Sequence, residues 1–406
     1  MTLLGDRPLS AATRVAGCIG HAATARLSRV VERDPLLWVF GAQSGEAFTD
    51  NAKYLFLHVC AHYPEIRPVW LSANRSVVTT LRSHGYEAYY TYSPRGLDVG
   101  RRAGVTFLTH RFGDVCASCS GGALAVMLWH GTPLKRISWD WETGYRTRSV
   151  ATRAATTYTY RRIDLLTAAS EATRESFASA FRIDPEVIAP TGYPRNDVFA
   201  REIPGSGIGI DEGLRERVRS LASEGPLWLY LPTYRRIGES AGVVEHVDFA
   251  ALDSFLAERG AFLLVKAHPF ERLALDGDLQ RVIRLPTALD VYPLLSATDG
   301  LLTDYSSILF DYLLLDRPLV FYPYDVERYR AERGFYYDYE SVTPGPVATD
   351  FEGLLGALDA AMTEDANGTD DNGYASERAR LRERFCREDE NRSEAVCEAV
   401  FERLNA

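Results

Sequence analysis

The chain has 406 residues, 46% of them hydrophobic and 25% charged, which is the composition of a folded globular protein long enough for two domains. Its formal net charge of −10 excludes a general nucleic-acid-binding surface, so a phosphate site needs locally clustered cations. No apolar run reaches the roughly 18 residues that span a bilayer. The six scattered cysteines, including the lone Cys116–Cys119 CxxC pair, favour free thiols in a reducing compartment.

Strands and helices alternate through the first half of the chain. The N-terminal segment is expected to be helical, and its alanine-rich part, residues 10–33, lacks the compact apolar region of a signal peptide. Apolar runs predict buried strands at 36–40, 68–71, 86–91, 105–108, 125–129, 163–167 and 187–189. Helices are predicted at 51–62 and 170–181. This alternation favours a parallel, doubly wound sheet.

A second alternation follows a break in the pattern. Residues 201–225 are glycine-rich and then helical without a strand, which places a domain junction there. Strands are predicted at 227–231, 261–267, 281–285, 300–303 and 318–322, then a polar loop at 365–373 and one long charged helix at 375–404 that packs back across the junction. We therefore expect a segment at 1–34 and two α/β domains at 35–205 and 206–406, with ligands at the carboxyl ends of the strands.

The stretch after the predicted strand 300–303 has the features of an anion site. Thr303 or Asp304 could cap a helix, which would place Ser306 and Ser307 in its first turn, where unpaired N–H groups and the helix dipole favour phosphate. Asp311 lies one turn further along and suits a substrate hydroxyl. The alternative is an ordinary capped helix between two core strands.

Two histidines end predicted strands, one in each half of the chain. His130 is followed by Gly131, which allows close approach of a backbone or ligand, and could act as a general base at neutral pH. A histidine bonded to the backbone is the alternative. Lys266 and His268 alternate out of another strand, so a cation and an imidazole are expected to point to one spot, which favours a diphosphate site. A core histidine is the alternative, and the neighbouring Lys266 counts against it.

Other polar motifs follow strands as well. Arg235 or Arg236 could bind a phosphate bidentately, and an exposed arginine pair is equally consistent with the sequence. A glycine-containing loop leads into a helix at Asn51 and Lys53, and it suits the acceptor side of a cleft. We find no phosphate-binding P-loop sequence and no metal-ligand spacing, so no metal is predicted.

Together these stretches resemble the CDP-glycerol glycerophosphotransferase family, which comprises the primases and polymerases of teichoic acid synthesis. The resemblance runs in order through 45, 50–53, 130–135, 192–197, 232–235, 266–269, 303–312, 317–325 and 334–338. It implies a GT-B fold, in which two Rossmann-like, doubly wound domains face a cleft. It also implies a CDP-linked donor, no cofactor or required metal, and peripheral attachment to the cytoplasmic face of the cell membrane.

The resemblance implies roles for individual residues. His130 and His268 match the family's two functional histidines, Ser306 and Ser307 match its phosphate-binding hydroxyls, and Asp311 matches a carboxylate near the donor's glycerol. The residues expected on the donor side are Lys266, Arg235, Thr303, Ser306, Ser307 and Asp311, and those on the acceptor side are Asn51, Lys53, Gly131, Thr132 and Lys135.

The function expected from this set is transfer of glycerol phosphate from CDP-glycerol to a hydroxyl of a lipid-linked, glycan or polyol-phosphate acceptor, with release of CMP. The absence of a sizeable extra N-terminal region favours a short, primase-like member. The alternatives are a GT-B glycosyltransferase that uses a nucleotide sugar, a CDP-ribitol-type transferase, and a non-catalytic binding module.

A basic, aromatic segment directly follows the His130 motif. Between residues 135 and 162 the chain carries one lysine, six arginines, two tryptophans and three tyrosines, with Asp140 and Glu142 as its only acids. Aromatic rings suit the headgroup region of a bilayer, and cations are attracted to an anionic leaflet. We expect this segment to contact an anionic membrane surface. A solvated basic helix or a lid over the diphosphate is the alternative.

Overall fold

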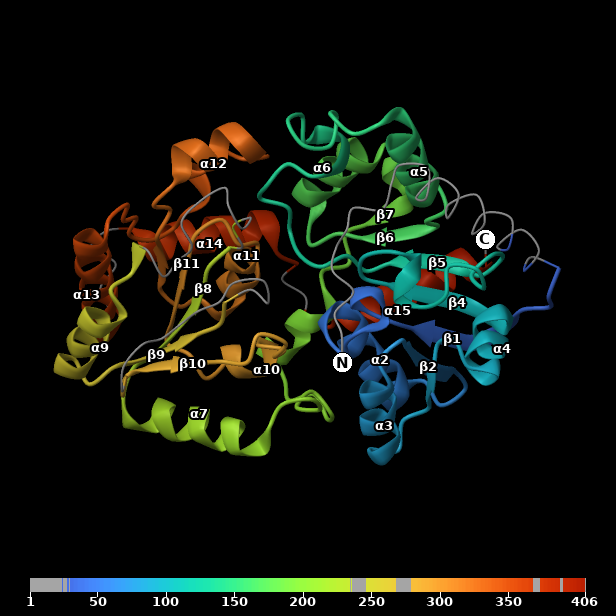
Figure 1. Ribbon diagram of the computed structural model, residues 1–406, viewed down its shortest axis with the longest axis horizontal. Coiled ribbons are helices and arrows are strands. Elements are labelled where there is room, and N and C mark those ends of the chain that lie inside the picture. Colours follow the sequence, from blue (N-terminus) through green and yellow to red (C-terminus); the bar gives the residue numbers. More distant parts are fainter. Residues whose placement is uncertain are drawn as a thin grey trace.

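The computed structural model describes residues 24, 28, 30–233, 235, 246–267, 279–367, 373–387 and 390–405. Figure 1 shows two lobes, each built on its own parallel sheet. The predicted N-terminal segment, residues 1–34, lies mostly outside the described residues, as do Arg236 and His268.

The N-terminal lobe is a seven-stranded parallel sheet in the order β3-β2-β1-β4-β5-β6-β7. Its strands are β1 (Asp34–Phe40), β2 (Arg67–Ser72), β3 (Ala88–Tyr90), β4 (Ala103–Leu108), β5 (Leu124–Met127), β6 (Leu165–Thr167) and β7 (Ile188–Ala189). The order reverses between β1 and β4, which is where doubly wound sheets bind ligands.

Helices cover both faces of this sheet, which explains its nearly continuous apolar strands. They are α2 (Asp50–His62), α3 (Arg75–Ser83), α4 (Pro94–Arg102), α5 (Val150–Tyr160) and α6 (Glu171–Phe181). Trp38 and Phe40 of β1 pack into the core on one face, and Leu37 and Val39 pack into the core on the other. The alternation along β1 thus supplies both cores.

The C-terminal lobe repeats the design with a five-stranded parallel sheet in the order β10-β9-β8-β11-β12. Its strands are β8 (Leu227–Leu231), β9 (Phe262–Val265), β10 (Val282–Arg284), β11 (Gly300–Thr303) and β12 (Leu319–Phe321). The helices are α7 (Glu212–Glu224), α9 (Phe249–Glu258), α10 (Tyr292–Leu295), α11 (Ile308–Tyr312), α12 (Val326–Arg333), α13 (Phe351–Asn367) and α14 (Tyr374–Phe385). Strand order reverses again between β8 and β11.

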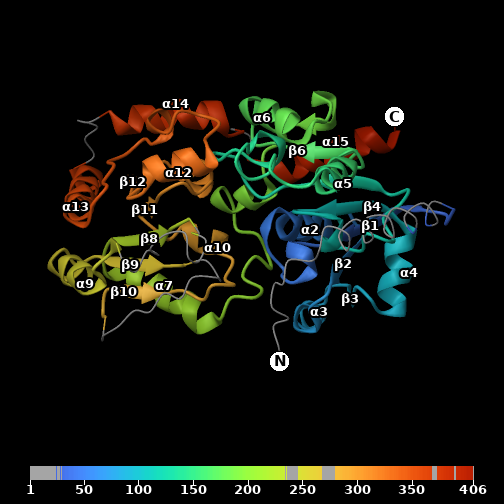
Figure 2. The same cartoon turned by 45° about the horizontal axis from the view of Figure 1, so that its top comes forward.

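The last helix, α15 (Arg392–Asn405), lies in the N-terminal lobe, as Figures 1 and 2 show. Its apolar face packs into the core that holds Trp38, and Phe401 lies 5.4 Å from the Trp38 ring. The prediction of one helix over 375–404 is wrong, because the chain forms α14 on the C-terminal lobe and α15 on the other. Asp197 separates them by accepting the backbone N–H groups of Arg392 and Ser393 at 3.0 Å each, which caps the start of α15.

The alternation of strands and helices predicted from the sequence is confirmed along both halves. The loop predicted at 365–373 is wrong at its start, because α13 continues to Asn367, and residues 368–372 lie outside the described residues. The two sheets divide between β7 and β8, on either side of the predicted junction. The boundaries 1–34, 35–205 and 206–406 stay a prediction.

Candidate active site

Two of the sequence motifs, one from each lobe, meet at Gly131. A Cβ atom built on Gly131 would lie 2.8 Å from Oγ of Ser307 and 2.9 Å from Nη2 of Arg195. Gly131 also has a φ of +131°, which side chains rarely adopt. The turn after β5 can therefore approach the start of α11 this closely only because residue 131 is glycine.

His130 lies in this turn. One nitrogen of its ring forms a hydrogen bond to the backbone, and the other nitrogen keeps a lone pair. Its Nδ1 lies 3.2 Å from the backbone carbonyl oxygen of Thr109. Because a carbonyl oxygen only accepts, Nδ1 carries the hydrogen, and the neutral ring keeps a lone pair on Nε2. Burial lowers the pKa of His130 well below its usual range, with His110 as the next cause. The half-buried ring is therefore a neutral base.

The side chain of Asn51 holds the turn that carries His130 through hydrogen bonds to its backbone. Its side-chain amide donates to the carbonyl oxygens of Leu128 and Trp129 at 3.1 and 3.0 Å. Trp129 has a φ of 55°, a conformation that costs energy in a bulky residue. Thr132 is fully buried. The predicted acceptor-side residue Asn51 thus supports the turn, and Thr132 is buried within it.

Arg195 connects this turn to the C-terminal lobe. Its Nη1 donates to Oδ1 of Asp50 at 2.8 Å and to the carbonyl oxygen of His130 at 3.2 Å. Its Nη2 donates to Oδ2 of Asp311 at 2.6 Å. Asp311 also accepts from Asn196 at 2.9 Å and from the Tyr292 hydroxyl at 2.6 Å. Both oxygens of Asp311 are therefore already bonded, and its predicted contact with a donor hydroxyl stays a prediction.

The serine pair precedes α11 rather than lying inside it. The helix begins at Ile308 with Ser307 at the N-cap and without a side-chain capping bond. The prediction that Thr303 or Asp304 caps the helix is wrong, since Thr303 lies in β11 and donates to the Leu231 carbonyl oxygen at 2.8 Å. Ser306 and Ser307 are half-buried, and neither hydroxyl bonds to another described residue. Both are therefore placed to donate to a ligand.

The lysines of the motifs have different surroundings. Lys53 is fully buried, and its Nζ lies 2.9 Å from Oδ2 of Asp290, which joins the two lobes. Lys266 is half-buried near the same carboxylate; burial lowers its pKa and Asp290 opposes this shift. Burial likewise lowers the pKa of Lys135 to about 8, against the influence of Asp304. Lys266 and Lys135 are better placed for an anionic substrate than Lys53.

Arg235 is already engaged with two carboxylates. Its Nε and Nη2 donate to Asp325 at 2.9 Å each, and Nη2 lies 3.0 Å from Oδ2 of Asp304. Asp304 in turn accepts the backbone N–H of Thr233. The Arg235 guanidinium therefore holds together the loops after β8 and β11. Its binding to a phosphate stays a prediction.

The 334–338 motif pairs with the segment after His130. Lys135 forms an antiparallel bridge with Phe335, and the backbone N–H of Tyr336 donates to the Leu134 carbonyl oxygen at 2.9 Å. The Trp141 indole donates to the Glu332 carbonyl oxygen at 3.0 Å. A pocket of about 450 Å³ lies between the two segments. These two segments, one from each lobe, thus lie side by side and line a pocket together.

A sequence model of the family described as CDP-glycerol:poly(glycerophosphate) glycerophosphotransferase matches residues 23–402. The chain belongs to this family. The predicted resemblance is thereby confirmed across nearly the whole chain.

Individual relatives support this family membership. The chain is 30% identical over 350 residues to a teichoic acid poly(glycerol phosphate) polymerase of Staphylococcus epidermidis, covering 80% of this chain and 45% of that protein. It is 27% identical over 377 residues to a teichoic acid glycerol-phosphate transferase of Staphylococcus aureus, covering 89% and 92%. It is 36% identical over 181 residues to a teichoic acid ribitol-phosphate primase of Bacillus spizizenii, covering 44% and 46%. The chain thus spans about half of the first and third relatives.

The fold matches a solved structure. The wall teichoic acid polymerase TagF superposes with a TM-score of 0.75 at 24% identity, covering 97% of each chain. At this identity the likeness shows the fold, and the predicted GT-B architecture of two doubly wound, parallel sheets is confirmed.

The candidate site also contains residues that the sequence did not single out. Asp114 holds the loop after β4: its Oδ2 accepts the backbone N–H groups of Thr109 and His110 at 2.8 and 2.7 Å. Its Oδ1 accepts the N–H of Ser44 at 2.7 Å. A carboxylate that follows a strand end by a few residues is a common local turn signal, and that signal could have indicated Asp114.

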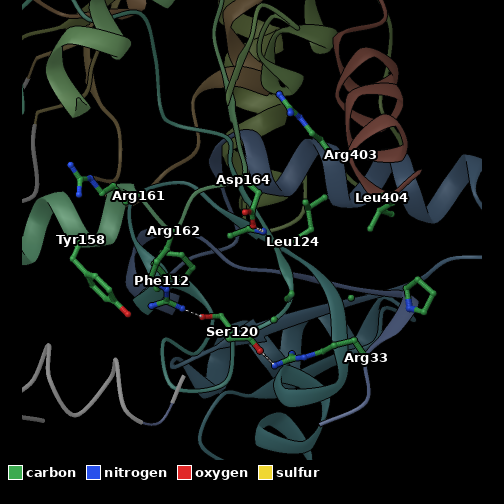
Figure 3. Close-up of a pocket in the computed structure, with 16 residues that line it drawn as sticks. Arg33, Phe112, Ser120, Leu124, Tyr158, Arg161, Arg162, Asp164, Arg403 and Leu404 are labelled. Carbon is green, nitrogen blue, oxygen red and sulfur yellow. Dashed lines mark hydrogen bonds between the residues drawn. The ribbon is translucent and has the colours of Figure 1, made fainter. Parts of the chain in front are cut away.

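A second pocket lies at the amino-terminal ends of the strands, opposite the site. It has a volume of about 800 Å³ and is lined by Arg33, Arg161, Arg162 and Arg403. Figure 3 shows these guanidinium groups pointing in different directions. Arg33 donates to backbone carbonyl oxygens, and Arg162 donates to the Ser120 hydroxyl at 3.1 Å. The arginines therefore do not converge on one ligand position.

No group of three or more His, Cys, Asp and Glu side chains in the described ranges could hold a metal ion. No helix in the same ranges is both long and apolar enough to cross a membrane.

Proposed function

We propose that this chain transfers glycerol phosphate from CDP-glycerol to a hydroxyl of a lipid-linked or polymeric acceptor and releases CMP. The observation that carries the proposal is the neutral base His130 with a lone pair on Nε2, in a turn packed against Ser307, where neither the Ser306 nor the Ser307 hydroxyl bonds to another described residue. A base from one lobe and phosphate donors from the other meet where an acceptor and a donor would react.

In this mechanism the acceptor hydroxyl attacks the phosphorus that carries glycerol. Nε2 of His130 takes the hydroxyl proton as the new P–O bond forms, and the bond from that phosphorus to the bridging oxygen of CMP breaks. Ser306, Ser307 and Lys266, together with His268, hold the diphosphate and balance the charge that develops on CMP. Such a reaction depends on positioning and charge stabilisation rather than on a covalent nucleophile.

The identity of the donor is a separate part of the proposal. Among the relatives, some are named for glycerol phosphate and others for ribitol phosphate. We propose CDP-glycerol because the family description names it and because the S. aureus glycerol-phosphate transferase is matched over 92% of its length. CDP-ribitol is the alternative within the family, and a nucleotide sugar is the alternative within the fold.

A panel of donors tests the proposal. Wild-type protein, His130→Asn and a control variant of the exposed His84, His84→Asn, are incubated with CDP-glycerol, CDP-ribitol or common nucleotide sugars and a glycerol phosphate-primed lipid acceptor. We expect CMP release from CDP-glycerol, at least about a hundredfold slower in His130→Asn and unchanged in the control. Turnover of nucleotide sugars alone, or nucleotide binding with no turnover of any donor, would sink the proposal. Preference for CDP-ribitol would correct the donor.

We further propose that the protein attaches peripherally to the cytoplasmic face of the cell membrane. Support comes from the outer surface of the 135–162 segment, where Val150 is 73% and Tyr158 40% exposed on α5 and Arg148 is exposed beside them. The inner aromatics contribute less, because Tyr145 is buried and Trp139 lies under the Arg182 guanidinium at 3.5 Å.

A further inference from the structure

The base His130 has a second histidine lying flat against it. The rings of His110 and His130 are 4.1 Å apart between centroids and only 2° from parallel. His110 follows β4 by two residues and His130 follows β5 by three, and Leu108 pairs with Met127 in the sheet. Two neighbouring strands thus bring both imidazoles to the same edge.

Thr109 forms hydrogen bonds with both imidazole rings. Its carbonyl oxygen bonds Nδ1 of His130 at 3.2 Å, and its hydroxyl oxygen lies 2.8 Å from Nδ1 of His110. The same hydroxyl lies 3.3 Å from the carboxylate of Asp114, which also accepts the backbone N–H groups of Thr109 and His110. With the Thr109 hydroxyl donating to Asp114, its oxygen accepts from Nδ1 of His110. The stack is therefore fixed by bonds at both rings.

We propose that His110 is a positioning residue for proton transfer, which fixes the plane of the His130 ring and keeps that ring neutral because a proton on His110 opposes a proton on His130. The inference rests on the proposed role of His130 as base. His110 itself is not assigned any contact with the substrate.

The groups that face His130 favour the neutral form of its ring. Burial is the largest cause of its lowered pKa, His110 is the second, and Arg195 and Lys135 act in the same direction, while the bond to Thr109 opposes them. The charge of Arg195 is balanced by Asp50 and Asp311. His110 is thus the imidazole that stacks directly on the base and contributes to its lowered pKa.

A variant that removes the charge of His110 but keeps an aromatic ring distinguishes the effect of His110 on the protonation of His130 from the packing of the ring. His110→Phe retains a flat ring that can stack, His110→Asn removes the ring, and His84→Phe serves as a control at an exposed histidine outside the site. The titration of His130 is followed by NMR of histidine-labelled protein, and kcat is measured across pH with CDP-glycerol.

We expect His110→Phe to move the titration of His130 and the acid limb of kcat upward by about half a pH unit or more, which is roughly a threefold loss of rate on that limb. His110→Asn should show the same shift with a lower plateau, and the control should show neither. An unchanged His130 titration in folded His110→Phe, or in His110→Asn if the first variant does not fold, would overturn the inference. Absence of all turnover in wild type would instead refute the proposed function, because the NMR titration does not depend on it.

Discussion

Arg195 and Asp311 form a buried ion pair between the two lobes, with Nη2 of the arginine 2.6 Å from Oδ2 of the carboxylate. Their side chains are only 6% and 2% exposed. The arginine also bonds the carbonyl oxygen of His130, and the aspartate lies in the helix that follows Ser307. The pair therefore sets the distance between the proposed base and the proposed phosphate donors.

Breaking this pair is expected to destabilise the fold. In Asp311→Asn, Arg195 keeps only Asp50 as a carboxylate partner in a buried site, which should lower the free energy of unfolding by about 3 kcal/mol. Denaturant unfolding measures the change, and Asp98→Asn, which removes exposed pairs on α4, should cost under about 1 kcal/mol. Equal stability of Asp311→Asn and wild type would contradict the structural role. A raised KM for CDP-glycerol at normal stability would favour the donor contact instead.

Gly131 should tolerate no side chain. In Gly131→Ala the new Cβ meets Ser307 and Arg195 at under 3 Å and strains a backbone of positive φ, so the proposed base moves away from the proposed phosphate donors. We expect kcat/KM to fall about tenfold to a hundredfold. The matched control is Gly209→Ala, which has a φ of +91° but no neighbour within 4 Å. A comparable loss of activity in both variants would show that backbone strain, not the contact, is responsible.

The lowered pKa of Lys135 predicts a pH dependence of stability. Its pKa falls from 10.5 to about 8 on folding, so between these values the unfolded chain holds a proton that the folded chain lacks. Stability contributed by this group therefore rises with pH across that window, by up to about 3 kcal/mol. Lys135→Met should lack the rise, and unfolding of both proteins at pH 7.5 and 10 measures the difference. An identical change in both proteins would show that Lys135 titrates normally.

The sequence was sufficient to predict the strands because both sheets are covered on both faces. Apolar runs such as 227–231 become fully buried strands, whichever neighbours they take. Contacts between remote residues were not predictable in the same way. Arg195 lies in a glycine-proline turn, and nothing local distinguishes a surface arginine there from one paired with a carboxylate 116 residues away.

The wrong predictions have the same origin. The break between α14 and α15 depends on Asp197, which lies 195 residues before the helix start that it caps. The pairing of Lys53 with Asp290 spans 237 residues, so the sequence could not indicate this link between the lobes, and the acceptor-side role of Lys53 stays a prediction. Of the residues that the sequence analysis missed, His110 was the easiest to predict. Neighbouring parallel strands such as β4 and β5 place the residues that follow them side by side.

The membrane proposal predicts binding that depends on exposed arginines. Arg146 and Arg148 are exposed, whereas Arg153 packs over Trp139 at 5.6 Å and is left unchanged to protect the fold. Arg146→Glu with Arg148→Glu should weaken binding to vesicles containing anionic lipid, because each cation near an anionic leaflet contributes about 1 kcal/mol. Co-sedimentation at low and high salt measures this binding.

A control on another surface makes the membrane test specific. Arg215→Glu with Arg219→Glu makes the same change of charge on α7, in the C-terminal lobe. Neutral vesicles should bind neither protein strongly, and titration with CDP-glycerol should show unchanged donor binding in both double variants. The 135–162 segment would lose its proposed role if both double variants bound anionic vesicles equally. If Val150→Asp on α5 also weakened binding at high salt, insertion of the exposed apolar face would add to the electrostatic attraction.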